Sequence, residues 1–139
     1  MTPRAEMTSK DELLSIREMC DAFEVTPRTL RFYEAKELLS PLRRGTARFF
    51  TYRDRARLKL ILRGKRFGFS LEDIRQLLDM YDREGRQQEA QLRRTYEVAA
   101  ERLAQMERQR AELDEAIAEL KDQMAWGAGV LAAFRKAAE

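Results

Sequence analysis

A heptad pattern in the second half of the chain restricts the fold more than any other sequence feature. Between Arg86 and Met124 there is no Gly and no Pro, so nothing in this stretch interrupts a helix. Residues at alternating spacings of four and three form one seam, and Arg110 is its only charged member. The seam consists of Leu92, Tyr96, Ala99, Leu103, Met106, Arg110, Leu113, Ile117, Leu120 and Met124.

This seam predicts a dimerisation coiled coil. A helix over 86–124 would be about 58 Å long at ~1.5 Å per residue. So narrow a stripe cannot bury itself, and a second copy of the chain supplies a matching one, so we expect a homodimer. The alternative is that the helix folds back on the N-terminal half as ordinary core. Both parallel and antiparallel pairs fit the seam, and Arg110 could set the register or extend to the edge of the pair.

The first half of the chain is predicted to form four short helices joined by short connecting segments. Hydroxyl residues that can cap a helix predict helices over 15–23, 26–37, 51–66 and 70–83. The first two are separated by so few residues that they form a helix-turn-helix. Pro41 and Gly45 mark a turn, and Ala47 to Phe50 could form the return strand of a hairpin. Together these elements predict a winged helix-turn-helix. The four capping residues are Ser15, Thr26, Thr51 and Ser70.

Positive charge is concentrated in one part of the first half. The whole chain has a formal net charge of only +3. Between Arg43 and Arg66, however, there are ten basic residues and one acid, Asp54. Such a block fits either a solvated face or an electrostatic footprint for phosphates.

The residue counts exclude several classes of protein. Cys20 is the single cysteine and there is no histidine, which excludes an intramolecular disulfide, a Cys/His zinc site and histidine-based acid–base catalysis. Neither a Gly-rich phosphate loop nor a nucleophile motif is present. We therefore expect no enzyme, cofactor or metal. No apolar run approaches the ~20 residues that span a membrane, and the N-terminus lacks a signal-peptide core, so we expect a cytoplasmic protein.

Three stretches carry a resemblance to a known family. They are TPRTLRFYEAKELLSP, GTARFFTYRD and RLKLILRGKRFGFSLEDIRQLL, and over residues 13–83 they resemble the MerR family of bacterial transcription regulators. The resemblance implies a homodimer with an antiparallel coiled coil, and a winged helix-turn-helix on each half of an inverted repeat. It implies further that the dimer bends and untwists promoter DNA with an overlong spacer, so that RNA polymerase can use it. The stretch RLKLILRGKRFGFSL also resembles a subgroup associated with branched-chain amino acid and acyl-CoA catabolism.

The chain departs from the family pattern at two places. Glu37 stands where the family usually has Gly after the recognition helix, and a left-handed backbone at a residue other than Gly is unfavourable. Metal-sensing members carry cysteines near the distal end of the long helix, and this chain has none there. A mercury, copper or zinc sensor is therefore not expected, and the small-molecule effector is unassigned.

The expected fold class is all-α, with four segments. Residues 1–12 form a flexible lead, 13–85 the DNA-binding domain, 86–124 the coiled-coil helix, and 125–139 a tail with a short final helix after the glycines at 127 and 129. A dimeric regulator on promoter DNA is the leading function. The alternatives are an architectural or recombination-associated DNA binder and a coiled-coil adaptor.

The expected DNA contacts fall into groups. Arg28, Thr29, Arg31 and Phe32 lie on the helix that should enter the major groove, while the Tyr33 hydroxyl could reach a phosphate or the ring could pack in the core. Wing residues should contact the backbone or the minor groove. Arg55, Arg57 and Lys59 are either phosphate contacts or solvated, and Cys20 is expected in the core. The full set of expected DNA-binding residues is Arg17, Thr26, Arg28, Thr29, Arg31, Phe32, Tyr33, Arg43, Arg44, Arg48, Phe50, Arg53, Arg63 and Lys65.

Overall fold

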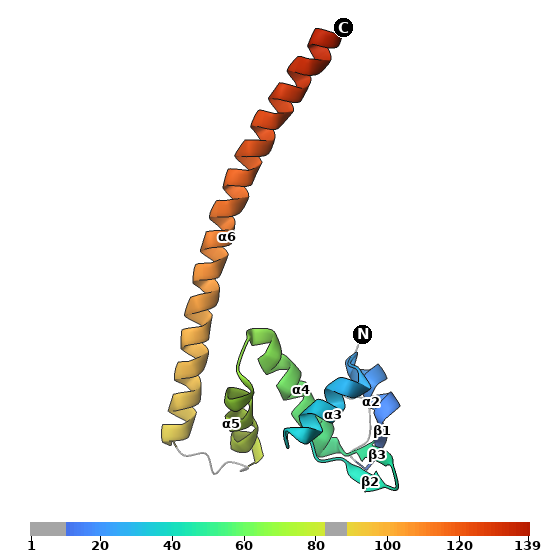
Figure 1. Ribbon diagram of the computed structural model, residues 1–139. Coiled ribbons are helices and arrows are strands. Elements are labelled where there is room, and N and C mark those ends of the chain that lie inside the picture. Colours follow the sequence, from blue (N-terminus) through green and yellow to red (C-terminus); the bar gives the residue numbers. More distant parts are fainter. Residues whose placement is uncertain (1–10, 83–88) are drawn as a thin grey trace. The chain divides into compact units, whose positions relative to one another are not determined.

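The computed structural model describes residues 11–82 and 89–139 (Figure 1). The chain divides into two units between Thr95 and Tyr96. Most of the expected flexible lead, residues 1–12, lies outside the described residues. The described elements are β1 (Leu14–Ser15), α2 (Ile16–Phe23), α3 (Pro27–Ala35), β2 (Leu42–Arg44), β3 (Ala47–Phe50), α4 (Tyr52–Phe67), α5 (Leu71–Asp82) and α6 (Glu89–Ala138).

A small antiparallel sheet corrects the expectation of an all-α fold. Its strand order is β1-β3-β2, and the β2–β3 hairpin is the expected wing. The third strand, β1, pairs Leu14 with Phe50, which joins the start of the domain to the end of the wing. Strand pairing between residues so far apart leaves no local sequence signal, because each partner alone is a strand of only two to four residues.

The capping residues begin the helices as expected. At α2 the Ser15 hydroxyl accepts a hydrogen bond from the Glu18 N–H at 3.1 Å, and the Glu18 carboxylate accepts one from the Ser15 N–H at 3.0 Å. Thr51 and Asp54 form the same reciprocal pair at α4. Each box satisfies backbone N–H groups that the first turn of a helix leaves free. The helix starts were therefore predictable to within one residue.

The turn after α3 accommodates Glu37 in a left-handed conformation, with φ of 61°. A residue with a Cβ pays roughly 1–2 kcal/mol there. Hydrogen bonds on both sides of the turn offset this strain. The Leu38 N–H donates to the Tyr33 carbonyl at 2.9 Å, Arg57 Nε donates to the Leu38 carbonyl at 2.7 Å, and Arg75 Nη2 donates to the Lys36 carbonyl.

One hydrophobic core lies within Leu14–Leu78. Around this core, α4 and α5 pack closely because Gly64 in α4 has no side chain. A Cβ built there would lie 2.8 Å from Ile74 Cγ1 of α5, closer than real contacts allow. The buried core residues are Leu14, Met19, Leu30, Tyr33, Leu38, Leu39, Phe50, Leu58, Ile61, Ile74 and Leu78.

The long helix α6 is continuous from Glu89 to Ala138, so the expected break and separate final helix are wrong. Its 50 residues span about 75 Å at ~1.5 Å per residue. Gly127 and Gly129 each weaken a helix by only about 1 kcal/mol, and the surrounding sequence is otherwise helix-forming. The heptad spacing also continues through this part, at Gly127, Leu131, Phe134 and Ala138.

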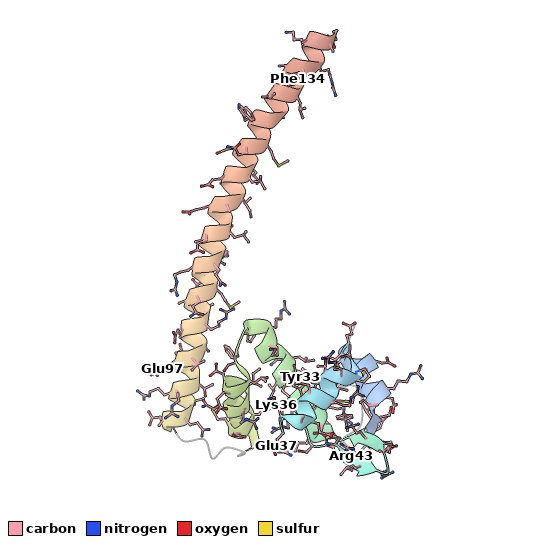
Figure 2. The ribbon with its side chains drawn as sticks, viewed as in Figure 1. Tyr33, Lys36, Glu37, Arg43, Glu97 and Phe134 are labelled. Carbon is pink, nitrogen blue, oxygen red and sulfur yellow. The ribbon has the colours of Figure 1, made fainter. Side chains whose placement is uncertain are left out.

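None of the residues of α6 is buried. The apolar members of the seam are largely exposed, among them Leu113 at 60% and Leu120 at 62%. Figure 2 shows side chains projecting from α6 along its length, from Glu97 to Phe134.

Candidate nucleic-acid interface

The second helix of the helix-turn-helix presents basic and aromatic side chains to solvent. A left-handed Glu24, with φ of 56°, ends α2, and Thr26 caps α3 by accepting from the Thr29 N–H at 3.2 Å. The two hydroxyls also bond to each other at 3.0 Å. Leu30 is fully buried and fixes the inner face of α3. The outward-facing residues are Arg28, Arg31 and Phe32, all exposed.

Two expected contact residues belong to the core instead. Phe50 is fully buried, where it pairs across the sheet with Leu14, so the interpretation of Phe50 as a DNA contact is wrong. Tyr33 is 5% exposed and packs in the same core, as its alternative interpretation held. Burial raises the pKa of the Tyr33 hydroxyl. Neither placement could be predicted from the sequence, because alternating and helical patterns do not show which of two adjacent aromatic residues points inward.

The wing is a hairpin whose two faces differ. Gly45, with φ of 63°, lies in the two-residue turn that joins Arg44 to Ala47, where a left-handed backbone is favourable for Gly. Arg43 and Arg48 are directly opposite each other across the strands and therefore share a face. Arg44 lies on the other face, with its guanidinium 5.3 Å from the centre of the Phe49 ring.

Glu34 of α3 binds both Arg43 and Arg48. We call the face of the wing that carries these two arginines the inner face, and the face that carries Arg44 the outer face. Arg48 Nε donates to Glu34 Oε1 at 2.8 Å, and Arg43 Nη2 donates to both carboxylate oxygens at 3.1 Å. Burial acts to raise the pKa of Glu34, but the hydrogen bonds and charges of Arg48 and Arg43 outweigh it and hold this pKa below its usual value. Glu34 was not predicted from the sequence. The available signal is the two-residue turn of the hairpin, which places Arg43 opposite Arg48, so that two like charges on one face require an acidic partner.

The basic block on α4 divides into structural and exposed residues. Arg55 is 2% exposed, with Nη1 donating to the Glu12 carbonyl at 2.7 Å, and Arg57 is buried against the turn that follows α3. Neither reading offered for these two residues, phosphate contact or solvation, is therefore right. The other expected contacts outside α3 and the wing are all exposed: Arg17, Arg53, Arg63 and Lys65.

Cys20 packs against the core from α2, in agreement with its expected role. Burial, followed by the charge of Asp21, raises the pKa of its thiol, while Arg31 acts in the opposite direction. A raised pKa favours the thiol form, which is a weaker nucleophile than a thiolate.

Across residues 11–82 and 89–139, no helix has the length and apolar character needed to cross a membrane. The same residues contain no cluster of three or more acidic or cysteine side chains arranged to hold a metal ion.

Two family profiles overlap on the chain and together cover most of it. The profile described as MerR HTH family regulatory protein matches residues 14–81. The profile described as MerR, DNA binding, matches residues 55–123, which extends from α4 well into α6. Both profiles describe DNA-binding or regulatory proteins, which is the class that the sequence predicted.

Curated relatives resemble the N-terminal half. The HTH-type transcriptional regulator ZntR of Escherichia coli K12 is 42% identical over 67 residues, which are 47% of this chain and 48% of that protein. ZntR of Escherichia coli O157:H7 gives the same values. The chain therefore matches about half the length of these relatives.

Solved structures share the fold over most of the chain. A MerR family regulator from Bacillus cereus has a TM-score of 0.61 and 26% identity, covering 81% of this chain and 82% of that one. PbrR691 from Ralstonia metallidurans CH34, solved with lead(II), has a TM-score of 0.57 and 28% identity, covering 78% and 83%. HiNmlR, a MerR family regulator lacking the sensor domain and solved on promoter DNA, has a TM-score of 0.59 and 22% identity, covering 76% and 79%. With its helix-turn-helix, hairpin wing and long helix matched in this way, the chain belongs to the MerR family of helix-turn-helix regulators.

Proposed function

We propose that the protein is a homodimeric transcription regulator that binds an inverted repeat within a promoter. The observation that carries this proposal is the outer surface of α3, where Arg28, Arg31 and Phe32 are exposed on the second helix of a helix-turn-helix. An α-helix fits the major groove, and arginine can bind guanine there through two hydrogen bonds. The exposed wing and the basic residues of α4 supply phosphate contacts that orient α3.

The exposed seam of α6 supports the dimer. Apolar residues at heptad spacing in a helix without buried residues are the pattern of a coiled coil before its partner is added. A dimer with twofold symmetry carries two identical DNA-binding domains, and its binding site is correspondingly an inverted repeat. The antiparallel orientation of the pair rests on the resemblance to the MerR family, because the seam itself fits both orientations.

The proposed mechanism is deformation of the promoter rather than recruitment alone. Wings and recognition helices on both half-sites hold the ends of the operator, so a change in the dimer can bend and untwist the spacer between them. RNA polymerase is then the partner that uses the deformed promoter, and the cytoplasm is the compartment. The finer subgroup, linked to branched-chain amino acid and acyl-CoA catabolism, rests on the stretch RLKLILRGKRFGFSL.

Capture of genomic fragments tests the proposal. The purified protein is mixed with sheared DNA of its source genome, and bound fragments are sequenced. One or a few inverted repeats in overlong promoter spacers are expected, and the adjoining genes test the subgroup. Scattered fragments without a motif would favour the architectural alternative, and no enrichment at low salt would refute DNA binding.

An Arg31→Ala variant tests the role of α3 once the operator is known. If Arg31 reads a base, operator affinity falls by about 1–3 kcal/mol. An unchanged affinity in a gel-shift titration would remove Arg31 from the interface.

A further inference from the structure

The two arginines of the inner wing face are held by one carboxylate, and this arrangement suggests different tasks for the three wing arginines. Arg43 and Arg48 are directly opposite each other in the β2–β3 pair. Like charges in that position destabilise a hairpin. Glu34 reaches both from α3, so the recognition helix supplies the countercharge that the wing itself lacks.

The two partners of Glu34 are not equivalent. The Arg48 side chain is 21% exposed, and its bond to Glu34 Oε1 is the shorter one at 2.8 Å. The Arg43 side chain is 53% exposed and binds Glu34 through Nη2 only (Figure 2 labels Arg43 on the wing). Because a guanidinium carries five N–H donors, Arg43 can bind a phosphate while it remains bound to Glu34.

The outer wing face carries the third arginine. Arg44 is exposed and stacks on Phe49, and its guanidinium lies on the opposite side of the hairpin from Glu34. Stacking on a ring holds the guanidinium in place and leaves its N–H groups at the edge available.

We propose that Glu34 is a positioning residue that fixes the wing to the recognition helix through Arg48, and that Arg43 and Arg44 are the wing's phosphate-binding residues. This inference rests on the proposed DNA-binding function. It assigns to Arg48 a role different from that of its two neighbours, although all three are arginines of one hairpin.

Removal of the Glu34 charge separates this inference from simple electrostatics by the sign of the effect. An acid that merely lies near DNA repels it, so its loss should strengthen binding to every duplex. A positioning acid has the opposite effect on the operator. We expect Glu34→Gln to weaken binding to the captured operator duplex by about tenfold, the effect of roughly one charge-assisted hydrogen bond. A scrambled duplex of equal length should be bound as tightly as before or more tightly.

Glu37→Gln is the matched control, because Glu37 is an exposed glutamate three residues away that makes the same carboxylate-to-amide change. It should alter operator affinity by less than about twofold. If Glu34→Gln strengthened binding to both duplexes, the positioning role would be refuted.

A measurement without DNA keeps this inference separate from the proposed function. Hydrogen exchange of the backbone amides in residues 42–50 should accelerate in Glu34→Gln and stay unchanged in Glu37→Gln. If exchange accelerates but the wild-type protein binds no duplex, the link between wing and helix stands and the DNA-binding function falls. Unchanged exchange would refute the link itself.

Three variants of the wing test the division of tasks and do not depend on the folding of Glu34→Gln. Arg43→Gln and Arg44→Gln should each reduce the slope of log affinity against log salt by roughly 0.9 per chain, one phosphate's share. Arg48→Gln should lower operator affinity and wing protection but leave that slope unchanged. An equal loss of slope in all three variants would overturn the assignment of Arg48.

Discussion

The two parts of the molecule use apolar residues in opposite ways. Within Leu14–Leu78 most of the large apolar residues form or pack against one buried core, while α6, with its longer apolar seam, buries none of its residues. The core of the first part can be explained by contacts within one chain. The seam of α6 cannot, since a row of exposed apolar residues at heptad spacing is stable in water only against another helix. We infer that the first part folds by its own contacts and that α6 requires a second copy.

The largest expected effect comes from a charge placed in the seam. Leu113→Asp would bury a carboxylate at the centre of the proposed dimer without a partner, and we expect the dimer to dissociate. Light scattering should then give the mass of one chain, 16.4 kDa, in place of twice that value. Ala111→Asp, off the seam on the same helix, is the control and should leave the dimer intact. A Leu113→Asp variant that remained dimeric would contradict the seam.

Next comes a cavity in the core of the first part. Phe50→Ala removes a fully buried ring at the junction of the sheet and the helices, and should lower the free energy of unfolding by about 3–5 kcal/mol. Denaturant unfolding followed by circular dichroism measures this loss. A stable variant with weakened DNA binding would restore Phe50 to the DNA interface, which the structure argues against.

The same substitution at two helical glycines, one in α4 and one in α6, compares the two parts of the molecule directly. Gly64→Ala in α4 forces a Cβ against Ile74 at 2.8 Å, so despite better helix propensity it should destabilise the protein by about 1–3 kcal/mol. Gly129→Ala in α6 meets nothing within 4 Å and should stabilise the helix by up to about 1 kcal/mol. Thermal unfolding of both variants should show shifts of opposite sign. Destabilisation by Gly129→Ala would mean that another surface packs closely on that face of α6.

The smallest expected effect is a pH dependence carried by Glu34. Its pKa is lower in the folded protein than in the unfolded chain, where it is about 4.3, so the unfolded state binds more protons between the two values. The stabilisation is therefore present above about pH 4.3 and is lost as the pH falls through the folded pKa. The difference in stability between wild type and Glu34→Gln should shrink in acid. A difference that is constant from pH 7 to pH 3 would contradict the two ion pairs.

Local features were predictable from the sequence, and features that depend on distant partners were not. Capping residues marked the helix starts, and Gly45 with the basic hairpin marked the wing. Sequence could not show that β1 pairs with the end of the wing, because a two-residue strand has no pattern of its own.

The same limit applied to the charged residues and to the end of α6. Arg55 and Arg57 have the composition of a surface patch, yet each is buried and donates a hydrogen bond to a backbone carbonyl distant in sequence, which makes burial of the charge tolerable. The glycines at 127 and 129 predict a break in the long helix. Their small individual cost was outweighed by the helix-forming residues around them and by a heptad spacing that continues to Phe134.

The most direct test of the central claim is the mass of the protein bound to its captured operator, measured by native mass spectrometry. If α6 joins two copies that each present one winged helix-turn-helix, the complex contains two chains per duplex, and Leu113→Asp reduces the affinity as it removes the second chain. A complex with one chain per duplex at undiminished affinity would contradict the account.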